Sequence, residues 1–198
     1  MAHYTGLVTV DISSYENFKS AILGNGYDVD GLYGEQCVDL AKLLAGNAGR
    51  PSPYWKSEPD GYAYEGWSNV GSREYNAGSL FTLVYNKGDV KKGDLVVLSN
   101  TTSNPYGHIA FANSNWNADI TTAELLGQNQ ENPSASVGYL TTLTNVNVST
   151  FLGAFRFIAW QTTPPTPPSG GVRVTKSKFP WVLYARKLRE KRSGMWYN

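Results

Sequence analysis

Cysteine and histidine are scarce in this 198-residue chain, and they stand where they could do chemistry. Cys37 is the only cysteine, so it has no partner for an internal disulfide, and it heads an apolar helical pattern. A thiol in the first turn of a helix faces unpaired backbone N–H groups and the positive end of the helix dipole, which both favour the thiolate. Cys37 is therefore a candidate nucleophile, and a small apolar core residue is the alternative.

A nucleophilic thiol needs a base, and the chain offers two histidines. His3 lies near the start of the chain, where we expect a frayed segment. His108 opens the apolar run 109–112, which predicts a strand that would hold the imidazole in place. His108 is the better candidate for the base, and an ordinary half-buried histidine at a strand start is the alternative.

Three carboxylates flank the candidate nucleophile in the sequence. Asp28 and Asp30 are separated by one residue, Gly31 permits a tight turn, and Asp39 comes two residues after Cys37. Hard oxygen ligands suit Ca²⁺ better than Zn²⁺, which prefers His and Cys. The spacing is not that of an EF-hand, because no Glu closes a twelve-residue loop. The loop is a candidate calcium site, and a solvated acidic turn is the alternative.

The elements that must position these residues are helices first and strands later. Ser13 and Glu16 have the spacing of a capping box, which predicts a helix over residues 14–23. Apolar residues recur at helical spacing from residue 36 to 46, which predicts a second helix that begins at the cysteine. Segments rich in apolar residues and bounded by turn residues predict five strands, at 95–98, 108–112, 123–126, 138–142 and 155–160. Helices followed by a meandering antiparallel sheet indicate an α+β domain.

The C-terminal part differs in composition from the rest. Residues 162–171 contain closely spaced prolines and then two glycines, which predicts a linker after a main domain of residues 1–161. Residues 172–198 carry eight Lys or Arg and one acidic residue, interleaved with aromatic residues. This segment is too short for an ordinary core of its own, and its charge suits polyanions such as wall teichoic acids. Besides a small wall anchor, the alternatives are an element that folds back onto the main domain, a subunit-contact segment and a solvated basic end.

The start of the chain shows no targeting pattern. It lacks a basic segment followed by an apolar run, and no apolar stretch approaches the roughly 18 residues of a membrane span. We therefore expect a product made in the cytoplasm without a signal peptide, which would need another route to act outside a membrane.

Four motifs in order resemble the CHAP domains (cysteine, histidine-dependent amidohydrolases/peptidases) of bacteriophage lysins and bacterial wall hydrolases. The motifs are Asp28–Asp39, Val90–Val97, Tyr106–Ala110 and Gly127–Gln130, and together they span most of residues 10–160. The resemblance implies a papain-like fold, with N-terminal helices packed on an antiparallel sheet. It also implies that residues 1–161 form a catalytic domain that cuts amide bonds in peptidoglycan.

The resemblance implies a role for each site residue. Cys37 would attack the carbonyl, and His108 would take the thiol proton and later give one to the leaving amine. Gln36 and the backbone N–H of Cys37 would form an oxyanion hole. Many relatives orient the histidine with a Glu two residues before an Asn, but this chain has Gly127 and Asn129 there. Asn129 is therefore the expected orienting residue, and Gln128 and Glu124 are weaker candidates.

The resemblance also implies a ligand set for a structural Ca²⁺. The carboxylates of Asp28, Asp30 and Asp39 would bind it, together with the backbone carbonyls of Leu32 and Gly34. We expect the ion to fix the loop before the nucleophile, and not to polarise the substrate.

The predicted function is that of a phage lysin, either an endolysin released onto the wall or a virion component. It would be an N-acetylmuramoyl-L-alanine amidase or an endopeptidase of the stem or cross-bridge, with bacterial peptidoglycan as partner. A non-catalytic wall-binding module on the same scaffold is the alternative, because the acid at position 127 is missing. A papain-like protease is a third possibility. No nucleic-acid partner is expected, and the sequence leaves the oligomeric state open.

Overall fold

The computed structural model describes residues 1–50, 62–68, 80–130 and 139–161. The predicted linker (162–171) and basic segment (172–198) lie outside the described residues. The helices are α1 (Tyr15–Ile22), α2 (Asp39–Asn47), α3 (Glu65–Ser68) and α4 (Ile158–Gln161), with a 3-10 helix η2 (Lys87–Asp89). The strands are β1 (His3–Thr5), β2 (Gly26–Asp28), β3 (Phe81–Val84), β4 (Leu95–Leu98), β5 (His108–Ala112), β6 (Thr122–Gly127), β7 (Thr142–Asn147) and β8 (Phe151–Phe157).

The main sheet has six strands in the order β3-β8-β4-β5-β6-β7, and every neighbouring pair is antiparallel. β4 pairs with β5 so that Leu98 lies opposite His108 and Leu95 opposite Phe111. The candidate base therefore lies in the middle of the sheet order, at one end of its strand. The described ranges hold no helix that is long and apolar enough to cross a membrane.

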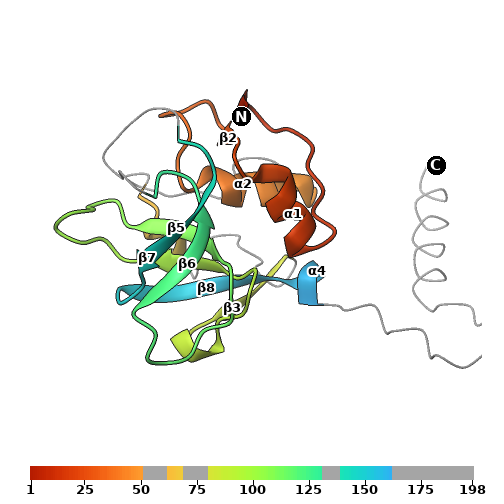
Figure 1. The fold of residues 1–198 in the computed structure, drawn as a ribbon. Helices are drawn as coiled ribbons and strands as arrows, with labels where there is room; N and C mark the ends of the chain where they lie inside the picture. The colour runs from red at the N-terminus through yellow and green to blue at the C-terminus, as the bar shows by residue number, and fades with distance from the viewer. Residues whose placement is uncertain (51–61, 69–79, 131–138, 162–198) are drawn as a thin grey trace, which may run out of the picture. The chain divides into compact units, whose positions relative to one another are not determined.

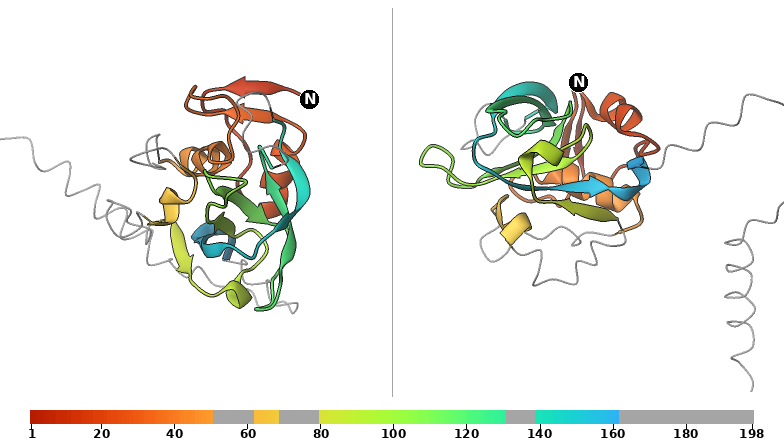
Figure 2. Two further views of the ribbon diagram at one scale, coloured as in Figure 1. Left: turned by 90° about the vertical axis from the view of Figure 1, so that its left-hand side faces the viewer. Right: turned by 90° about the horizontal axis from the view of Figure 1, so that it is seen from below.

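Alternating side chains give the sheet two apolar faces. One face, which includes Val97 and Phe111, packs in a cluster with Phe18 of α1 and Leu44 of α2. Figures 1 and 2 show α1 and α2 lying together on one side of the sheet. The opposite face contributes Ala110 and its neighbours to a second cluster. Helices packed on an antiparallel sheet confirm the predicted α+β class.

Both long helices begin later than predicted. The N-cap of α1 is Ser14, whose hydroxyl accepts from the N–H of Asn17, so the predicted Ser13–Glu16 capping box is wrong. α2 begins at Asp39, two residues after Cys37. The residues before α2 form a turn, in which the Asp39 carboxylate accepts the N–H of Gln36 at 2.8 Å.

Three of the five predicted strands match strands of the sheet. Segments 95–98 and 108–112 match β4 and β5, and 123–126 lies within β6. Segment 138–142 is wrong, because β7 begins only at Thr142. Segment 155–160 is right only for residues 155–157, since β8 ends at Phe157 and the chain turns into α4, where Trp160 donates its indole N–H to Ile12 O at 2.9 Å.

The N-terminal segment is ordered, contrary to the expectation of a frayed end. β1 pairs in parallel with β2, and Gly6 N–H bonds to Asp28 O at 2.8 Å. The His3 imidazole also contacts the buried carboxylate of Glu35, just before the candidate nucleophile. β1 therefore supports the loop that carries the predicted metal ligands.

Candidate active site

Residues 36–38, which we call the nucleophile turn, present Cys37 to the start of β5. The Cys37 side chain is nearly buried, and the backbone N–H of Ile109 is one of the groups that lower the pKa of its thiol. Ile109 directly follows His108, so the structure brings the segments of the two predicted catalytic residues together. α2 also contacts β2, which leads into the acidic loop.

The thiolate expected for Cys37 is not favoured in this structure. Burial raises the pKa of the thiol to about 11, although the backbone N–H groups of Ile109, Cys37 and Val38 act in the opposite direction. The carboxylate of Asp39 raises the pKa further. Because α2 begins only after the turn, N–H groups alone do not outweigh burial, and the resting thiol is neutral at pH 7.

The imidazole of His108 is also neutral at pH 7. Its side chain is buried, with 6% of the residue exposed, and burial lowers its pKa to about 4. The side chain of Gln130 acts in the opposite direction and raises this pKa. A neutral imidazole has a free lone pair, so His108 is in the protonation state of a general base.

Gln36 is held at both ends of its side chain. Its amide nitrogen donates to Tyr33 O at 2.7 Å, and its amide oxygen accepts from the side chain of Asn129 at 3.0 Å. Tyr33 has a positive φ of 67°, an uncommon conformation for a residue other than glycine. One hydrogen of the Gln36 amide remains beyond the bond to Tyr33, so its predicted role in an oxyanion hole stays a prediction.

Gln128 ties the nucleophile turn to β2. Its fully buried amide accepts the N–H of Tyr27 at 2.7 Å and donates to Tyr27 O at 2.9 Å and to Gln36 O at 3.1 Å. The hydroxyl of Thr141 donates to the same amide oxygen at 3.3 Å. Every hydrogen-bonding capacity of this amide is used for support, which argues against Gln128 as the residue that orients the imidazole.

Glu124 is directed elsewhere as well. It is exposed, and its carboxylate accepts from the side chain of Asn113. Asn113 in turn accepts the hydroxyl of Tyr15, so this network joins α1 to the sheet. Asn129 supports Gln36, and its predicted contact with the imidazole stays a prediction.

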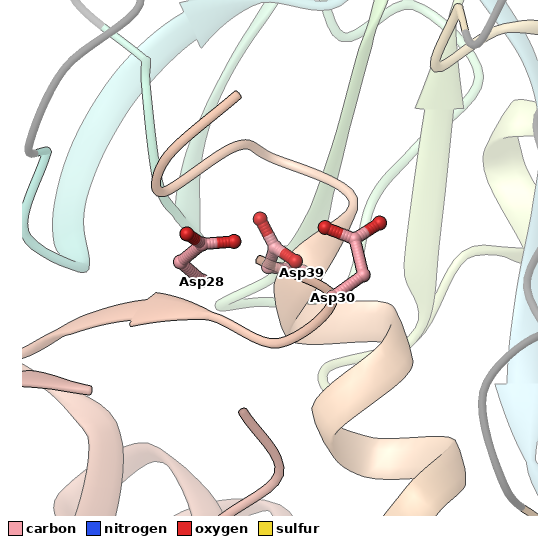
Figure 3. A group of neighbouring side chains, drawn as sticks. All are labelled: Asp28, Asp30 and Asp39. Atoms are coloured by element: carbon pink, nitrogen blue, oxygen red, sulfur yellow. The ribbon is translucent and has the colours of Figure 1, made fainter. Parts of the chain in front are cut away.

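The predicted carboxylate ligands lie together. Oxygen atoms of Asp28, Asp30 and Asp39 are all within 4.8 Å of one another, where β2 ends and α2 begins (Figure 3). Asp30 forms an ion pair with Lys42, and one oxygen of Asp28 is buried without a hydrogen-bond partner in the described part of the chain. The other predicted ligand residues, Leu32 and Gly34, follow on the same loop, and Leu32 is exposed.

Burial and like charge disfavour the ionised form of this cluster when no cation is bound. Burial raises the pKa of Asp39 to about 7, and the charge of Asp30 raises it further, although Lys42 and two backbone N–H groups lower it. Carboxylate oxygens and an unpartnered buried oxygen fit a hard divalent cation. The residues therefore fit the predicted ion.

Comparison with protein families decides what kind of domain this is. The family model described as "CHAP domain" matches residues 24–129, which are more than half of the chain. The chain belongs to the CHAP domain family. The resemblance inferred from the four motifs is confirmed.

Solved structures similar to this CHAP chain include two proteins. The wild type endolysin LysIME-EF1 has a TM-score of 0.53 and 26% sequence identity, over 72% of this chain and 63% of that one. The structure of Ly7917 has a TM-score of 0.43 and 16% identity, over 74% of this chain and 62% of that one. This chain therefore spans less than two thirds of the length of either. No curated protein matches significantly.

Sequence reasoning missed several supports of this CHAP site. The effect of the Ile109 N–H on the thiol comes from a backbone group, which no residue type reveals. Gln130 belongs to one of the four motifs, but nothing in its residue type or spacing indicates that its side chain turns back toward β5. The contact of His3 with Glu35 depends on β1, which is too short and too polar to be recognised from its pattern.

Proposed function

We propose that this CHAP domain is a peptidoglycan hydrolase that cleaves an amide bond with Cys37 as nucleophile and His108 as base. The observation that carries the proposal is that α2, which follows Cys37, contacts β5, which His108 begins, and that the Ile109 N–H beside His108 lowers the pKa of the Cys37 thiol. Membership of the CHAP family and the likeness to the endolysin LysIME-EF1 support a wall substrate. The substrate would be a muramoyl-alanine amide or a peptide bond of the stem or cross-bridge.

The two neutral groups define the order of the first proton transfer. His108 takes the proton of the Cys37 thiol as the sulfur attacks the carbonyl carbon, because neither group is ionised beforehand. The carbonyl oxygen becomes an oxyanion, which the Cys37 N–H and the remaining amide hydrogen of Gln36 stabilise. The C–N bond then breaks, the amine leaves with the proton from His108, and a thioester remains on Cys37.

Water completes the reaction. His108, neutral again, takes a proton from a water molecule as its oxygen attacks the thioester carbonyl. The C–S bond breaks, the acid product forms, and the thiolate recovers its proton from His108. His108 takes up and releases the proton in both halves of the reaction, so one histidine serves as base and as acid.

We also propose that the carboxylates of Asp28, Asp30 and Asp39 hold a structural Ca²⁺, with backbone carbonyls of Leu32 and Gly34. The support is their mutual proximity, the unpartnered oxygen of Asp28 and the raised pKa of Asp39. A bound cation would neutralise the cluster and tie β2 to the first turn of α2. Asp39 also accepts the N–H of Gln36, so the same carboxylate restrains the nucleophile turn.

The decisive experiment uses purified Gram-positive cell walls and the variant Cys37→Ala. The wild-type protein is expected to clear a wall suspension, and the variant is expected to bind without clearing it. Mass spectrometry of the soluble fragments then identifies the bond, since a new N-terminal alanine indicates an amidase and new ends in the stem or bridge an endopeptidase. Clearing by Cys37→Ala at the wild-type rate would refute the proposal.

One observation favours a second candidate, a wall-binding module without turnover. The thiol is neutral and nearly buried, whereas an activated cysteine nucleophile normally has a lowered pKa. Such a module would bind walls equally well with and without the substitution Cys37→Ala, and would release no fragments in either case. Wall binding without fragment release by the wild-type protein would establish it.

The remaining part of the proposal concerns location and the basic segment. We propose that the protein acts on the bacterial wall and that residues 172–198 add affinity for wall teichoic acid through their charge. Wall binding that weakens as salt rises, and that is lost from walls stripped of teichoic acid, would support this role.

A further inference from the structure

The carboxamide of Gln130 has a fixed orientation. Its nitrogen donates to the carbonyl oxygens of Thr142 at 3.0 Å, Leu125 at 3.2 Å and Gly127 at 3.4 Å. It is also 3.3 Å from the hydroxyl of Thr142. Carbonyl oxygens only accept, so this end of the side chain must be the NH₂ group. The amide oxygen Oε1 therefore faces away from these three carbonyls.

Two buried atoms near each other lack partners. In the described part of the chain, neither Oε1 of Gln130 nor Nε2 of His108 has a hydrogen-bond partner of standard geometry. The side chain of Gln130 nevertheless raises the pKa of His108, which indicates that it lies close to the imidazole. The two atoms are therefore candidates for an acceptor and a ring N–H that face each other without a bond of standard geometry. Hydrogen bonds of this kind in sites without substrate are often long and tighten in the complex.

Gly127 makes room for this contact. A Cβ at residue 127 would lie 2.9 Å from the Cβ of Ala110 and 2.9 Å from Cδ of Gln130. It would also lie 3.0 Å from Oε1 of Gln130. The carboxamide of Gln130 therefore occupies the space in which any side chain at position 127 would begin. Ala110 follows His108 by two residues and lies on the same face of β5.

We propose that Gln130 is the positioning residue of His108, with Oε1 accepting the Nε2–H of the imidazole. A neutral imidazole has one N–H, so this bond selects the tautomer in which Nδ1 keeps its lone pair. Nδ1 is then the atom that takes the proton of Cys37. The inference rests on the proposed function, because it names the group that prepares the base. It assigns to Gln130 the task for which the sequence pointed to Asn129.

The wild-type protein tests this assignment without any activity measurement. NMR of ¹⁵N-labelled protein reports which ring nitrogen carries the proton, and the chain has only two histidines. The variant His3→Gln identifies the signals of His108. We expect protonated Nε2 and unprotonated Nδ1 in the neutral ring. An Nδ1-protonated ring, or an equal mixture of the two tautomers, would overturn the proposal.

Two variants of Gln130 separate positioning from support of the fold. Gln130→Met and Gln130→Glu both lose the donated bonds to Leu125, Gly127 and Thr142, but only Glu keeps an oxygen that can face the imidazole. We expect kcat on soluble wall fragments to fall about 10- to 100-fold in Gln130→Met, with a smaller fall in Gln130→Glu. A purely structural role predicts equal losses, and that result would overturn the proposal.

The pH profile gives a second readout from the same variants. A carboxylate beside the ring favours the imidazolium, so the acid limb of kcat/KM should move to higher pH in Gln130→Glu. It should not move in the control Thr142→Val, which removes one hydroxyl contact of the Gln130 nitrogen and leaves Oε1 untouched. An unchanged limb in Gln130→Glu would contradict a contact with His108. Should Cys37→Ala retain turnover, the proposed function fails, while the tautomer measurement still decides the role of Gln130.

Discussion

The two sides of the candidate site are held by different chemistry. On the nucleophile side, the carboxylates of Asp28, Asp30 and Asp39 cluster near the start of α2, and Lys42 forms an ion pair with Asp30. On the histidine side, neutral amides at positions 128–130 bind backbone groups and Gln36. The geometry of the first side should therefore depend on cations, and that of the second should not.

The largest expected effect lies on the nucleophile side. Asp39→Ala removes the acceptor of two backbone N–H groups, of Val29 at 3.0 Å and of Gln36 at 2.8 Å. Leaving two buried donors unpaired should lower the free energy of unfolding by about 2 to 6 kcal/mol. Denaturant unfolding measures this loss. The control Asp11→Ala removes an exposed carboxylate that accepts from Ser13 and should change stability by about 0.5 kcal/mol or less.

The matching change on the histidine side should be independent of cations. Gln128→Met leaves the Tyr27 N–H and O unpaired in the interior, at a cost of about 2 to 6 kcal/mol. Because no charge is involved, the loss should be the same in calcium and in chelator. The exposed Gln161→Met is the control, with little expected change. A Gln128→Met loss that doubles in chelator would break the contrast between the two sides.

Removal of calcium should affect the nucleophile side alone. At a calcium concentration about 100 times its dissociation constant, binding stabilises the folded state by about 2.7 kcal/mol, and chelator should remove that amount. The melting temperature of the wild-type protein should fall in chelator, whereas that of Asp28→Asn should respond much less. Identical responses of the two proteins would exclude the acidic cluster as the site.

The pH dependence of stability should have opposite signs on the two sides. In chelator, the folded pKa of Asp39 is raised to about 7, so its carboxyl binds a proton more tightly when folded and its contribution weakens from about pH 4 to 7. His108 has a folded pKa lowered to about 4, so its contribution strengthens from about pH 4 to its unfolded value near 6.5. Melting curves of Asp39→Asn and His108→Gln across this range should lose the respective slopes.

The central strands and the carboxylate cluster could be predicted because their causes are local. β4 and β5 are short apolar runs between turn residues, and the spacing of Asp28, Asp30 and Asp39 brings them together once β2 leads into α2. The predicted helix starts were less accurate, because periodicity does not reveal the local bonds at a helix end. Ser14 caps α1 in place of Ser13, and Asp39 bonds backward to Gln36 N–H.

The electrostatic state of the site could not be predicted, because it depends on burial. The sequence placed Cys37 near helix N–H groups and so predicted a thiolate, but the low-dielectric surroundings outweigh these groups and raise its pKa. The position of Gln130 depends equally on tertiary contacts. Its nitrogen is anchored on β7, which follows it in the sequence by more than ten residues.

The claim that Cys37 and His108 act as a pair has one direct test. Because Cys37 is the only thiol, its alkylation by iodoacetamide reports on this site alone. The rate in the wild-type protein and in His108→Ala should be compared at pH 7, with circular dichroism to verify the fold of both. The account predicts at least a roughly tenfold slower reaction in His108→Ala, since the neutral thiol then lacks its base. Equal rates in the two proteins would contradict it.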